Sequence, residues 1–318
     1  MKNENTEVIE TPACPSCQGT VSELWSKACD FEMVSTGDEE FEYRQCCRCN
    51  TIFINPMPTD RLATIYPDNY YSFIDKSSSV AHRVKEFLDK RFFSKVLKRI
   101  PGKEIRALDI GGGTGWLLDI VCSVDHRVSH TQVVDLDSQA QRLAQAKGHS
   151  YFCGRIEDFN TNEKYNLVML LNLIEHVAEP AEVLKKISEL LSDDGVIIIK
   201  TPNVDSLDAR IFRSSYWGGL HCPRHWVLFS DESIKPLVQR AGLRVKTLSL
   251  TQGAPFWAWS VLIWLNQRGL ARIDRRRPVV QHPLHNILVA LFAGFDFARG
   301  LFFKTSQMML ILEKDRVG

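Results

Sequence analysis

The stretch Ala107-Leu-Asp-Ile-Gly-Gly-Gly-Thr-Gly115 decides the fold. Its first four residues form a short, mainly apolar run, as expected of a strand buried in a parallel sheet. Three glycines at alternate positions follow, and glycine lets a backbone turn sharply and approach a ligand closely. Residues 116–121 are mainly apolar and predict a helix, whose first N–H groups can bind an anionic group of a ligand. We therefore expect a strand, a ligand-binding turn and a helix.

The spacing of the glycines distinguishes between two classes of cofactor. A dinucleotide site has the pattern G-x-G-x-x-G, and its third glycine lets the helix pack on the strand, but the bulky Trp116 holds that position here. The chain instead has D-x-G-x-G-x-G, which resembles the first motif of class I S-adenosylmethionine (SAM) dependent methyltransferases. The resemblance implies that the methionine part of SAM is held by Asp109, Gly111, Gly113 and Gly115. A Gly-rich turn without a ligand is the alternative, because short glycine motifs recur by accident.

A second acid lies where a ribose-binding residue is expected. Residues 131–134 predict a second strand that leads into Asp135, about twenty residues after the turn. A carboxylate at this place can accept hydrogen bonds from both ribose hydroxyls. In the family, the loop after the third strand (residues 150–153) covers the adenine, and an acid in that loop contacts its amino group. Arg155 occupies the usual place of this acid, so Glu157 or Asp158 is the expected substitute.

Two further segments resemble the same family. Residues 165–177 resemble its fourth strand and the turn after it, usually written F-D-L-V…L-E-H-V, and we expect Asn172 to contact the cofactor. Glu175 and His176 are expected near a helix start, where the helix dipole favours an acid, with catalysis by His176 as the alternative. The fifth strand leads into Thr-Pro-Asn203, and the resemblance places Asn203 on the substrate side.

The composition narrows the class of protein. A chain of 318 residues is long enough for one large α/β domain with additions. The formal net charge is +1, so no overall field attracts nucleic acid. The start, Met-Lys-Asn-Glu-Asn-Thr-Glu, is charged and has no apolar core, so no signal peptide is expected. We expect a cytoplasmic protein with a small-molecule acceptor and no nucleic-acid partner, and the oligomeric state stays open.

The cysteines are concentrated near the N-terminus, in two C-x-x-C pairs. Six of the nine cysteines precede residue 50, and the pairs are Cys14 with Cys17 and Cys46 with Cys49. Two such pairs complete a tetrahedral thiolate site suited to structural Zn²⁺. A disulfide would need an oxidising compartment, and a redox role would need a helix after the first cysteine. The intervening residues are polar and predict a long loop that is poor in strands.

The segment after the second cysteine pair supports a second resemblance. Cys49-Asn-Thr-Ile-Phe-Ile-Asn-Pro-Met-Pro58, followed by Tyr70 and Tyr71, resembles bacterial methyltransferases that act on sugars or other cell-surface metabolites. These enzymes carry an N-terminal zinc ribbon that leads into an N-P-x-P segment and a Tyr-Tyr pair. The resemblance implies that Tyr70 and Tyr71 form a lid over the SAM pocket and contact the substrate. Simple packing of the two tyrosines is the alternative, since buried tyrosines usually find a polar partner.

A histidine-containing loop after the fifth strand carries the catalytic hypothesis. Residues 225–230, His-Trp-Val-Leu-Phe-Ser, resemble the His-Leu-x-x-Phe-Ser segment of these methyltransferases. In related sugar C-methyltransferases a matching histidine is proposed as the general base, and histidine suits this task because its pKa lies near neutrality. The resemblance implies that His225 is the base, and that His221 and Arg224 bind the substrate, with His221 as a second catalytic candidate. Alternatively, His225 anchors the loop by a hydrogen bond.

An apolar insertion precedes the last expected strand. Residues 254–265 and 287–295 are two apolar runs, joined by a link that is rich in arginine. Neither run reaches the roughly 18–20 residues that span a bilayer. Two apolar helices with tryptophans and an arginine cluster fit a hairpin that lies in an anionic membrane interface. Peripheral contact of residues 254–303 with the inner face of the membrane is therefore one expectation. A helical pair that covers the substrate cleft or forms a dimer is the alternative.

Together these segments predict a Rossmann-like, doubly wound α/β fold with seven strands, the last antiparallel. The expected divisions are a zinc ribbon (1–58), connecting and lid helices (59–104), the SAM-binding core (105–252), the helical insertion (253–304) and the final strand (305–318). The expected function is methyl transfer from SAM to oxygen or carbon of a sugar, glycan or lipid-linked metabolite. The alternative is a degenerate binding module of the same fold, and the altered positions Arg155 and Asn166 are its best support.

Overall fold

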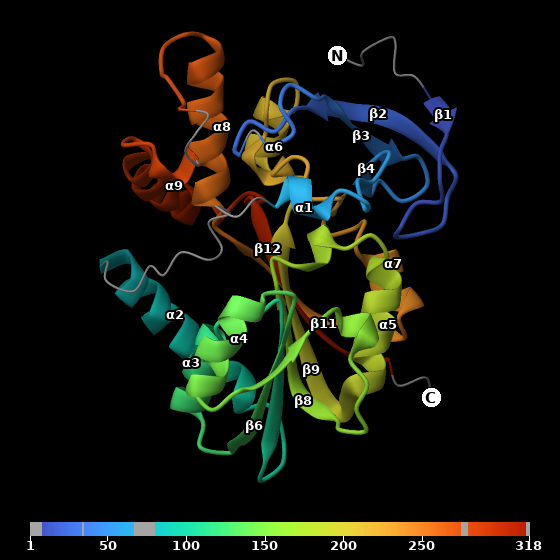
Figure 1. The fold of residues 1–318 in the computed structure, drawn as a ribbon, viewed down its shortest axis with the longest axis vertical. Coiled ribbons are helices and arrows are strands. Elements are labelled where there is room, and N and C mark those ends of the chain that lie inside the picture. The colour runs from blue at the N-terminus through green and yellow to red at the C-terminus, as the bar shows by residue number, and fades with distance from the viewer. Residues whose placement is uncertain (1–7, 34, 67–79, 275–278, 316–318) are drawn as a thin grey trace.

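The computed structural model describes residues 8–33, 35–66, 80–274 and 279–315, and structural statements below concern these ranges. Its centre is a seven-stranded sheet with the order β11-β12-β9-β8-β5-β6-β7 (Figure 1). Only β12 runs antiparallel to its neighbours in this sheet, which confirms the predicted Rossmann-like fold with an antiparallel last strand. The strands are β5 (Ile105–Ile110), β6 (Val128–Asp135), β7 (Ser150–Cys153), β8 (Tyr165–Leu171), β9 (Leu191–Pro202), β11 (Leu243–Thr251) and β12 (Gln307–Lys314).

Helices cover both faces of this sheet, and this explains why its central strands are almost wholly apolar. Figure 1 shows α2 (Val80–Leu97), α3 (Trp116–Val124) and α4 (Ser138–Ala146) on one side, and α5 (Pro180–Leu190) and α7 (Lys235–Arg240) on the other. The parallel strands end at one edge, so the loops that follow β5, β6, β8 and β9 meet there. The short elements at or near these loops are η2 (Ile156–Asp158), η3 (Ile174–His176), α6 (Leu207–Phe212) and η4 (Gly218–Leu220).

A second sheet contains the cysteine pairs and has the order β1-β2-β3-β4-β10. Its strands are β1 (Val8–Glu10), β2 (Val21–Ala28), β3 (Phe41–Cys46), β4 (Ile52–Ile54) and β10 (Val227–Leu228), and α1 (Leu62–Ile65) follows β4 in the chain. The expectation of a strand-poor stretch between the cysteine pairs was wrong. The segment Val-Ser-Glu-Leu-Trp-Ser-Lys-Ala of β2 has buried and exposed positions without strict alternation, because one of its pairings with β3 contains a bulge.

The ribbon sheet and the methyltransferase-like core form one body. Strand β10 belongs in sequence to the histidine-containing loop, yet it pairs antiparallel with β4 of the ribbon. Trp25, Tyr43 and Ile54 of the ribbon also lie in the same buried hydrophobic cluster as Trp217 and Phe229. The ribbon is therefore continuous with the loop that follows β9, although almost two hundred residues separate β2 from β10 in the chain.

The insertion before β12 is helical, as expected. It contains α8 (Ala254–Gln267), η5 (Val279–Gln281) and α9 (His285–Arg299), and α8 packs against α9 through stacked Trp257 and Phe292 rings. Within the part of the chain that the structure describes, no helix is both long and apolar enough to cross a membrane.

Candidate active site

The Gly-rich turn after β5 has the backbone that its sequence predicts. Gly111, Gly113 and Gly115 all have positive φ angles, 72°, 50° and 73°, a region that residues with side chains rarely adopt. A Cβ atom on Gly115 would lie only 2.5 Å from Cδ2 of His149, whereas no atom lies within 4 Å of the position that a Cβ on Gly113 would take. The turn is thus packed at its helix end and open in its middle, as close approach of a ligand requires.

Asp135 ends β6 beside this turn. Its Oδ2 accepts a hydrogen bond of 2.8 Å from the Gly113 N–H, and its Oδ1 accepts one of 3.0 Å from the Asp137 N–H. The side chain is half-buried, so these two bonds fix the carboxylate at the sheet edge while part of it stays accessible. The acid predicted to bind ribose and the turn predicted to bind methionine therefore form one hydrogen-bonded unit.

Asp109 lies beneath the turn and is almost wholly buried. Its Oδ2 has no hydrogen-bond partner among the described residues. Burial, and then the nearby charge of Asp135, raise the pKa of Asp109 to about 8. A buried carboxyl oxygen without a partner is costly, and a ligand that brings an N–H donor or a positive charge would relieve this cost. The orphaned oxygen therefore fits the ammonium group of SAM.

The remaining cofactor candidates lie along the same edge. Glu157 and Asp158 are exposed on η2, after β7, and Arg155 just before them is exposed as well. Asn172 ends β8 with φ 56°, and its Oδ1 accepts a hydrogen bond of 3.1 Å from Gln307. The next residue, Leu173, would contact a Cβ on Gly111 at 3.1 Å. The loop after β8 thus touches the Gly-rich turn.

Three histidines meet beyond that loop. The ring centroids of His176, His221 and His225 lie 4.6–6.2 Å apart. Nδ1 of His225 lies 2.7 Å from the carbonyl oxygen of Gly219. Because a carbonyl only accepts, Nδ1 must carry the proton, and Nε2 keeps its lone pair. Nε2 lies 4.0 Å from Oε1 of Glu175, an oxygen without a hydrogen-bond partner among the described residues.

Burial favours the neutral forms of His176, His225 and Glu175. Burial lowers the pKa of His225 well below its ordinary value, and it lowers the pKa of His176 to about 3; the neighbouring histidines add to both shifts. Burial likewise raises the pKa of Glu175 to about 8. A neutral imidazole with a free lone pair can accept a proton or bind a metal ion, and one ligand atom from each of Glu175, His176 and His225 lies within 4.8 Å of the others.

Two of the predicted substrate contacts, Arg224 and Asn203, have hydrogen-bond partners inside the protein. Arg224 has a wholly buried side chain, and its Nη1 and Nη2 pair with the two Asp30 oxygens at 3.2 and 2.8 Å. Asn203 is also fully buried, and its side-chain amide donates to Thr305 and accepts from the Asp205 N–H. Both side chains thus have structural contacts, and their contact with a substrate stays a prediction. Tyr70 and Tyr71 lie outside the described residues.

His221 has a partner that the sequence reasoning missed. Its Nδ1 lies 2.6 Å from Oε2 of Glu32, and both side chains are buried. Glu32 and Asp30 come from the ribbon, in the stretch that was expected to be only a loop. The available signal was a pair of acids around Phe31 between the cysteine pairs, but nothing in the sequence indicates which distant residues such acids meet.

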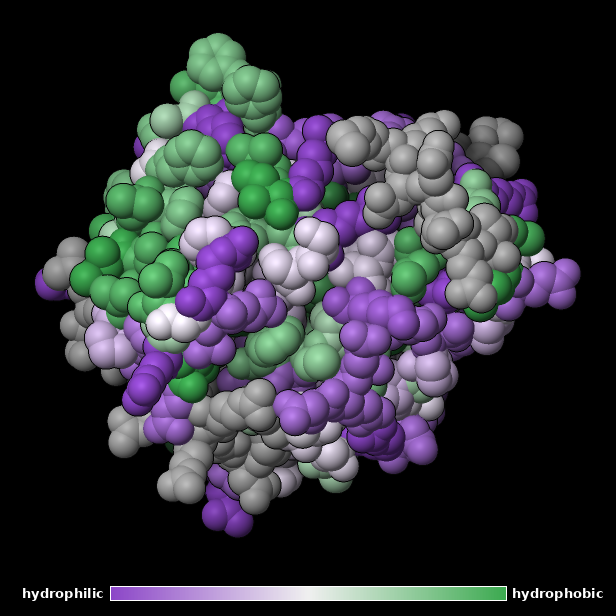
Figure 2. Space-filling model, turned by 90° about the horizontal axis from the view of Figure 1, so that it is seen from above, coloured by the Kyte–Doolittle hydropathy of each residue, from purple (hydrophilic) through white to green (hydrophobic). Residues whose placement is uncertain are grey.

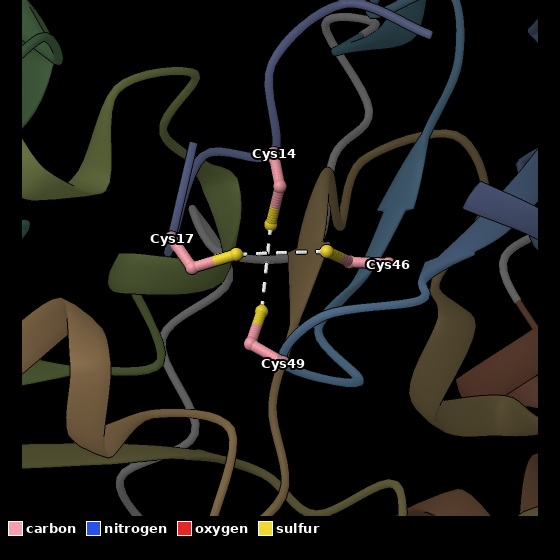
Figure 3. A group of neighbouring side chains, drawn as sticks. All are labelled: Cys14, Cys17, Cys46 and Cys49. Carbon is pink, nitrogen blue, oxygen red and sulfur yellow. Dashed lines mark hydrogen bonds between the residues drawn. The ribbon is translucent and has the colours of Figure 1, made fainter. Parts of the chain in front are cut away.

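The four expected metal ligands do meet (Figure 3). The Sγ atoms of Cys14 and Cys49, and those of Cys17 and Cys46, lie 3.6 Å apart, and all four lie within 4.8 Å of one another. A tetrahedron with Zn–S bonds of about 2.3 Å has edges of about 3.8 Å. In both pairs the residue after the second cysteine, Gln18 or Asn50, has positive φ and donates its N–H back to the first cysteine. The two turns thus have matching shapes, and the four thiols fit a zinc ion.

Comparisons with known proteins agree with this geometry. A ubiquinone biosynthesis O-methyltransferase of Rhodopseudomonas palustris is 29% identical over 107 residues, which cover 31% of this chain and 40% of the relative. The mitochondrial enzyme of the same name from Arabidopsis thaliana is 26% identical over 180 residues, 52% of this chain and 55% of the relative. The chain thus spans about half, or less, of the length of these curated relatives.

A solved structure and a family model also match this chain. The crystal structure of a candidate sarcosine dimethylglycine methyltransferase from Galdieria sulphuraria has a TM-score of 0.50 at 12% identity, and the match covers 73% of this chain and 88% of that one. A family model described as a methyltransferase domain matches residues 80–248, more than half of the chain and the whole region that carries the turn, Asp135 and the histidines. The protein therefore belongs to the methyltransferase domain family.

Proposed function

We propose that the protein methylates a hydroxyl oxygen of a small, lipid-linked acceptor, with His225 as the general base. The observation that carries this proposal is the tautomer of His225, whose Nδ1 is anchored by Gly219 and whose Nε2 keeps its lone pair. His225 can be both a loop anchor and a general base, since one ring nitrogen would anchor the loop while the other accepts the acceptor's proton. Loss of this proton makes the acceptor oxygen a better nucleophile.

The turn and its neighbours supply the cofactor site. Asp109 and the open middle of the turn would hold the methionine part, Asp135 would bind the ribose hydroxyls, and Glu157 or Asp158 would contact the adenine. When bound, SAM supplies a methyl group on a positively charged sulfur. The chain's own task is to hold the acceptor oxygen in line with that group, between Asn172 and the histidine cluster, and to remove its proton.

The choice of acceptor draws on the relatives and on one surface. The relatives are named for an O-methylation in ubiquinone biosynthesis, whereas no comparison supports the sugar or glycan acceptor that the sequence suggested. Large apolar side chains are exposed on α9 and the segment after it, and Figure 2 shows apolar residues gathered on that side. We call these residues the apolar surface: Leu284, Ile287, Leu291, Phe295, Phe297, Leu301, Phe302 and Phe303.

An anionic membrane is the partner that we propose for the apolar surface. Residues 268–304 contain seven basic and two acidic residues, and one of those acids, Asp296, is buried against Arg299. A segment whose sequence combines apolar side chains with excess positive charge favours a bilayer with anionic headgroups. Such a contact would place the protein where an acceptor with an apolar tail is dissolved.

We also propose that Cys14, Cys17, Cys46 and Cys49 bind one structural Zn²⁺. The spacing of the four Sγ atoms and the two matching turns support this assignment. A metal with four thiolate ligands has no open position for chemistry, so its contribution is to the fold. Cys47 is exposed and has no part in the site.

The first experiment compares wild type with His225→Gln. Purified protein receives SAM with a labelled methyl group and a panel of acceptors: a hydroxylated aromatic ring with an apolar tail, the same ring without the tail, and free sugars. We expect an O-methylated product from the tailed acceptor, and a turnover about 100-fold or more lower in the variant, because glutamine accepts no proton at this pH. SAM affinity measured by calorimetry should stay unchanged. Full turnover by the variant, or methylation of sugars alone, would overturn the proposal.

The membrane contact is tested by co-sedimentation with vesicles. Wild type should bind vesicles that contain anionic phospholipid and not those of neutral phospholipid alone. The double variant Leu301→Ser, Phe302→Ser should bind at least about tenfold more weakly, since each large apolar side chain gains about 1.5–3 kcal/mol on burial. Leu143→Ser on α4 is the matched control, because Leu143 is equally apolar and 58% exposed but lies outside the apolar surface. Equal binding of all variants would contradict the contact.

A further inference from the structure

We propose that two acids of the ribbon, Asp30 and Glu32, are positioning residues that hold the histidine cluster in its active geometry. This inference rests on the proposed placement of the acceptor at His225. It assigns the ribbon a part in the acceptor site, beyond the metal-binding role that its cysteines indicate. Three separate links between the ribbon and the cluster carry it.

The first link runs from Glu32 to His221. Oε2 of Glu32 accepts a hydrogen bond of 2.6 Å from Nδ1 of His221, and its Oε1 accepts one of 2.5 Å from the hydroxyl of Tyr216. The His221 ring also stacks on Trp259 of α8, with 5.8 Å between the ring centroids. The acid therefore fixes both the orientation and the tautomer of His221, as a carboxylate behind a histidine commonly does in catalytic and metal sites.

The second link runs from Asp30 through Arg224 to His176. The two carboxylate oxygens of Asp30 each accept a hydrogen bond from the guanidinium of Arg224, and both side chains are wholly buried. Nδ1 of His176 lies 3.0 Å from the main-chain oxygen of Arg224 and 2.9 Å from the hydroxyl of Tyr66. The acid thus fixes the residue whose carbonyl orients the His176 ring, and that ring packs against His225 at 4.6 Å.

The third link is a chain of backbone hydrogen bonds. Ile54 of β4 donates to the carbonyl of Trp226, and the N–H of Trp226 donates to the carbonyl of Glu175, at 2.9 and 2.7 Å. The loop that contains His225 is thereby held between the ribbon on one side and the loop after β8 on the other. The ribbon is thus linked to His221 through Glu32, and to His176 through Asp30 and Arg224. It is linked to the neighbour of His225 through the backbone of Trp226.

Asp30 and Glu32 need not contribute much to the free energy of unfolding. A buried ion pair such as Asp30 with Arg224 often contributes little more to stability than a well-packed apolar pair would. Buried acids that each hold a histidine or its neighbour instead give a defined geometry, because hydrogen bonds to a charged acceptor are short and directional. Preorganised groups of this kind are what a proton transfer to His225 would require.

The test is Glu32→Gln, with Glu40→Gln as the matched control. Both acids lie in the ribbon, but Glu40 is exposed and pairs only with Lys27. Glutamine has nearly the shape of glutamate and loses the charge that strengthens the bond to His221. We expect kcat with the tailed acceptor to fall about tenfold in Glu32→Gln, as for the loss of a charge-assisted hydrogen bond. SAM affinity should stay as in wild type, because the hydrogen bonds of Glu32 are made to His221 and Tyr216 and not to the Gly-rich turn. Glu40→Gln should match wild type throughout.

A second measurement does not depend on activity. The Nδ1 proton of His221 should give a far-downfield NMR signal that moves upfield in Glu32→Gln, together with changes in the ring signals of His176 and His225. Unchanged histidine signals would overturn the inference, as would losses of kcat, SAM affinity and thermal stability in equal proportion, which indicate a merely structural acid. Failure of the proposed function is a separate result: His225→Gln would then keep full turnover whatever Glu32→Gln does.

Discussion

The Gly-rich turn and the histidine cluster are built in opposite ways. The turn takes its shape from nine consecutive residues, 107–115, and from one acid at the end of the neighbouring strand. The cluster brings together residues from the ribbon, from the loop after β8 and from the loop that precedes β10. The first is a property of backbone geometry, whereas the second depends on side chains that meet only when the ribbon is docked on the core.

This difference separates two requirements of methyl transfer. Binding of the cofactor needs an open backbone and two acids, and all of these lie on the central sheet. Removal of the acceptor's proton needs a base that keeps its lone pair, and His225, the base that we propose, lies in a loop held by contacts that start in another sheet. Damage to the ribbon should therefore affect catalysis far more than cofactor binding, and damage to the turn should affect cofactor binding directly.

The largest effect is expected from Cys49→Ser. Loss of one of four thiolates weakens zinc binding strongly, and zinc ligands are coupled to local folding. We expect no retained zinc in the purified variant and a fall in methyl transfer of about a hundredfold, because β4, Asp30 and Glu32 lose their fixed positions. SAM affinity should change by no more than about threefold, equivalent to less than 1 kcal/mol. Metal analysis by mass spectrometry, calorimetry and the transfer assay measure the three quantities.

Cys47→Ser is the control for this prediction. Cys47 lies between two of the expected ligands but is exposed and outside the cluster, so its variant should retain zinc and full activity. If Cys49→Ser lost SAM binding as completely as methyl transfer, the two regions would not be separable in the way that their construction suggests.

Asp135→Ala should weaken SAM binding and leave the histidine cluster unchanged. The carboxylate accepts from Gly113 and is placed to accept from two ribose hydroxyls. Loss of hydrogen bonds to this charged acceptor should cost about 3 kcal/mol, roughly a hundredfold in SAM affinity. The NMR signals of His176 and His225 should stay in place, because no contact joins Asp135 to the cluster. Calorimetry that finds wild-type affinity for SAM would remove Asp135 from the cofactor site.

The same contrast explains what could be predicted from the sequence. The turn was predicted correctly from a local pattern of glycine and apolar residues, and the seven-stranded sheet with its antiparallel last strand was predicted correctly from the resemblance to methyltransferases. The four cysteines were also brought together as expected, because C-x-x-C spacing by itself determines the shape of each turn. These features depend on neighbours in the chain, which a sequence displays directly.

The contacts that the sequence did not indicate are those between residues far apart in the chain. Arg224 and Asn203 were assigned to the substrate, and both are buried and paired within the protein. The charge of Arg224 and its position in the motif did not indicate that it pairs with Asp30, which lies in a stretch that was expected to be a loop. The pairing of β10 with β4 joins segments far apart in the chain, and a two-residue strand has no periodicity that could indicate it.

The smallest expected effect concerns Asp109 and sharpens the description of the turn. Burial and the charge of Asp135 raise the pKa of Asp109 to about 8, from an ordinary value of 3.8. Between these two values the folded, SAM-free protein holds a proton that the unfolded chain has released, so its stability must fall as pH rises through this window. Asp109→Asn cannot ionise and should lose this dependence. At pH 8 the SAM-free variant should be more stable than wild type, and the difference should be smaller at pH 5. Thermal melts at pH 5, 6.5 and 8 measure this difference, and SAM should bind the variant more weakly because asparagine offers its ammonium group no charge. Parallel melting curves at all three pH values would show that Asp109 is ionised in the folded protein, and the turn would then hold two charged acids side by side before any ligand arrives.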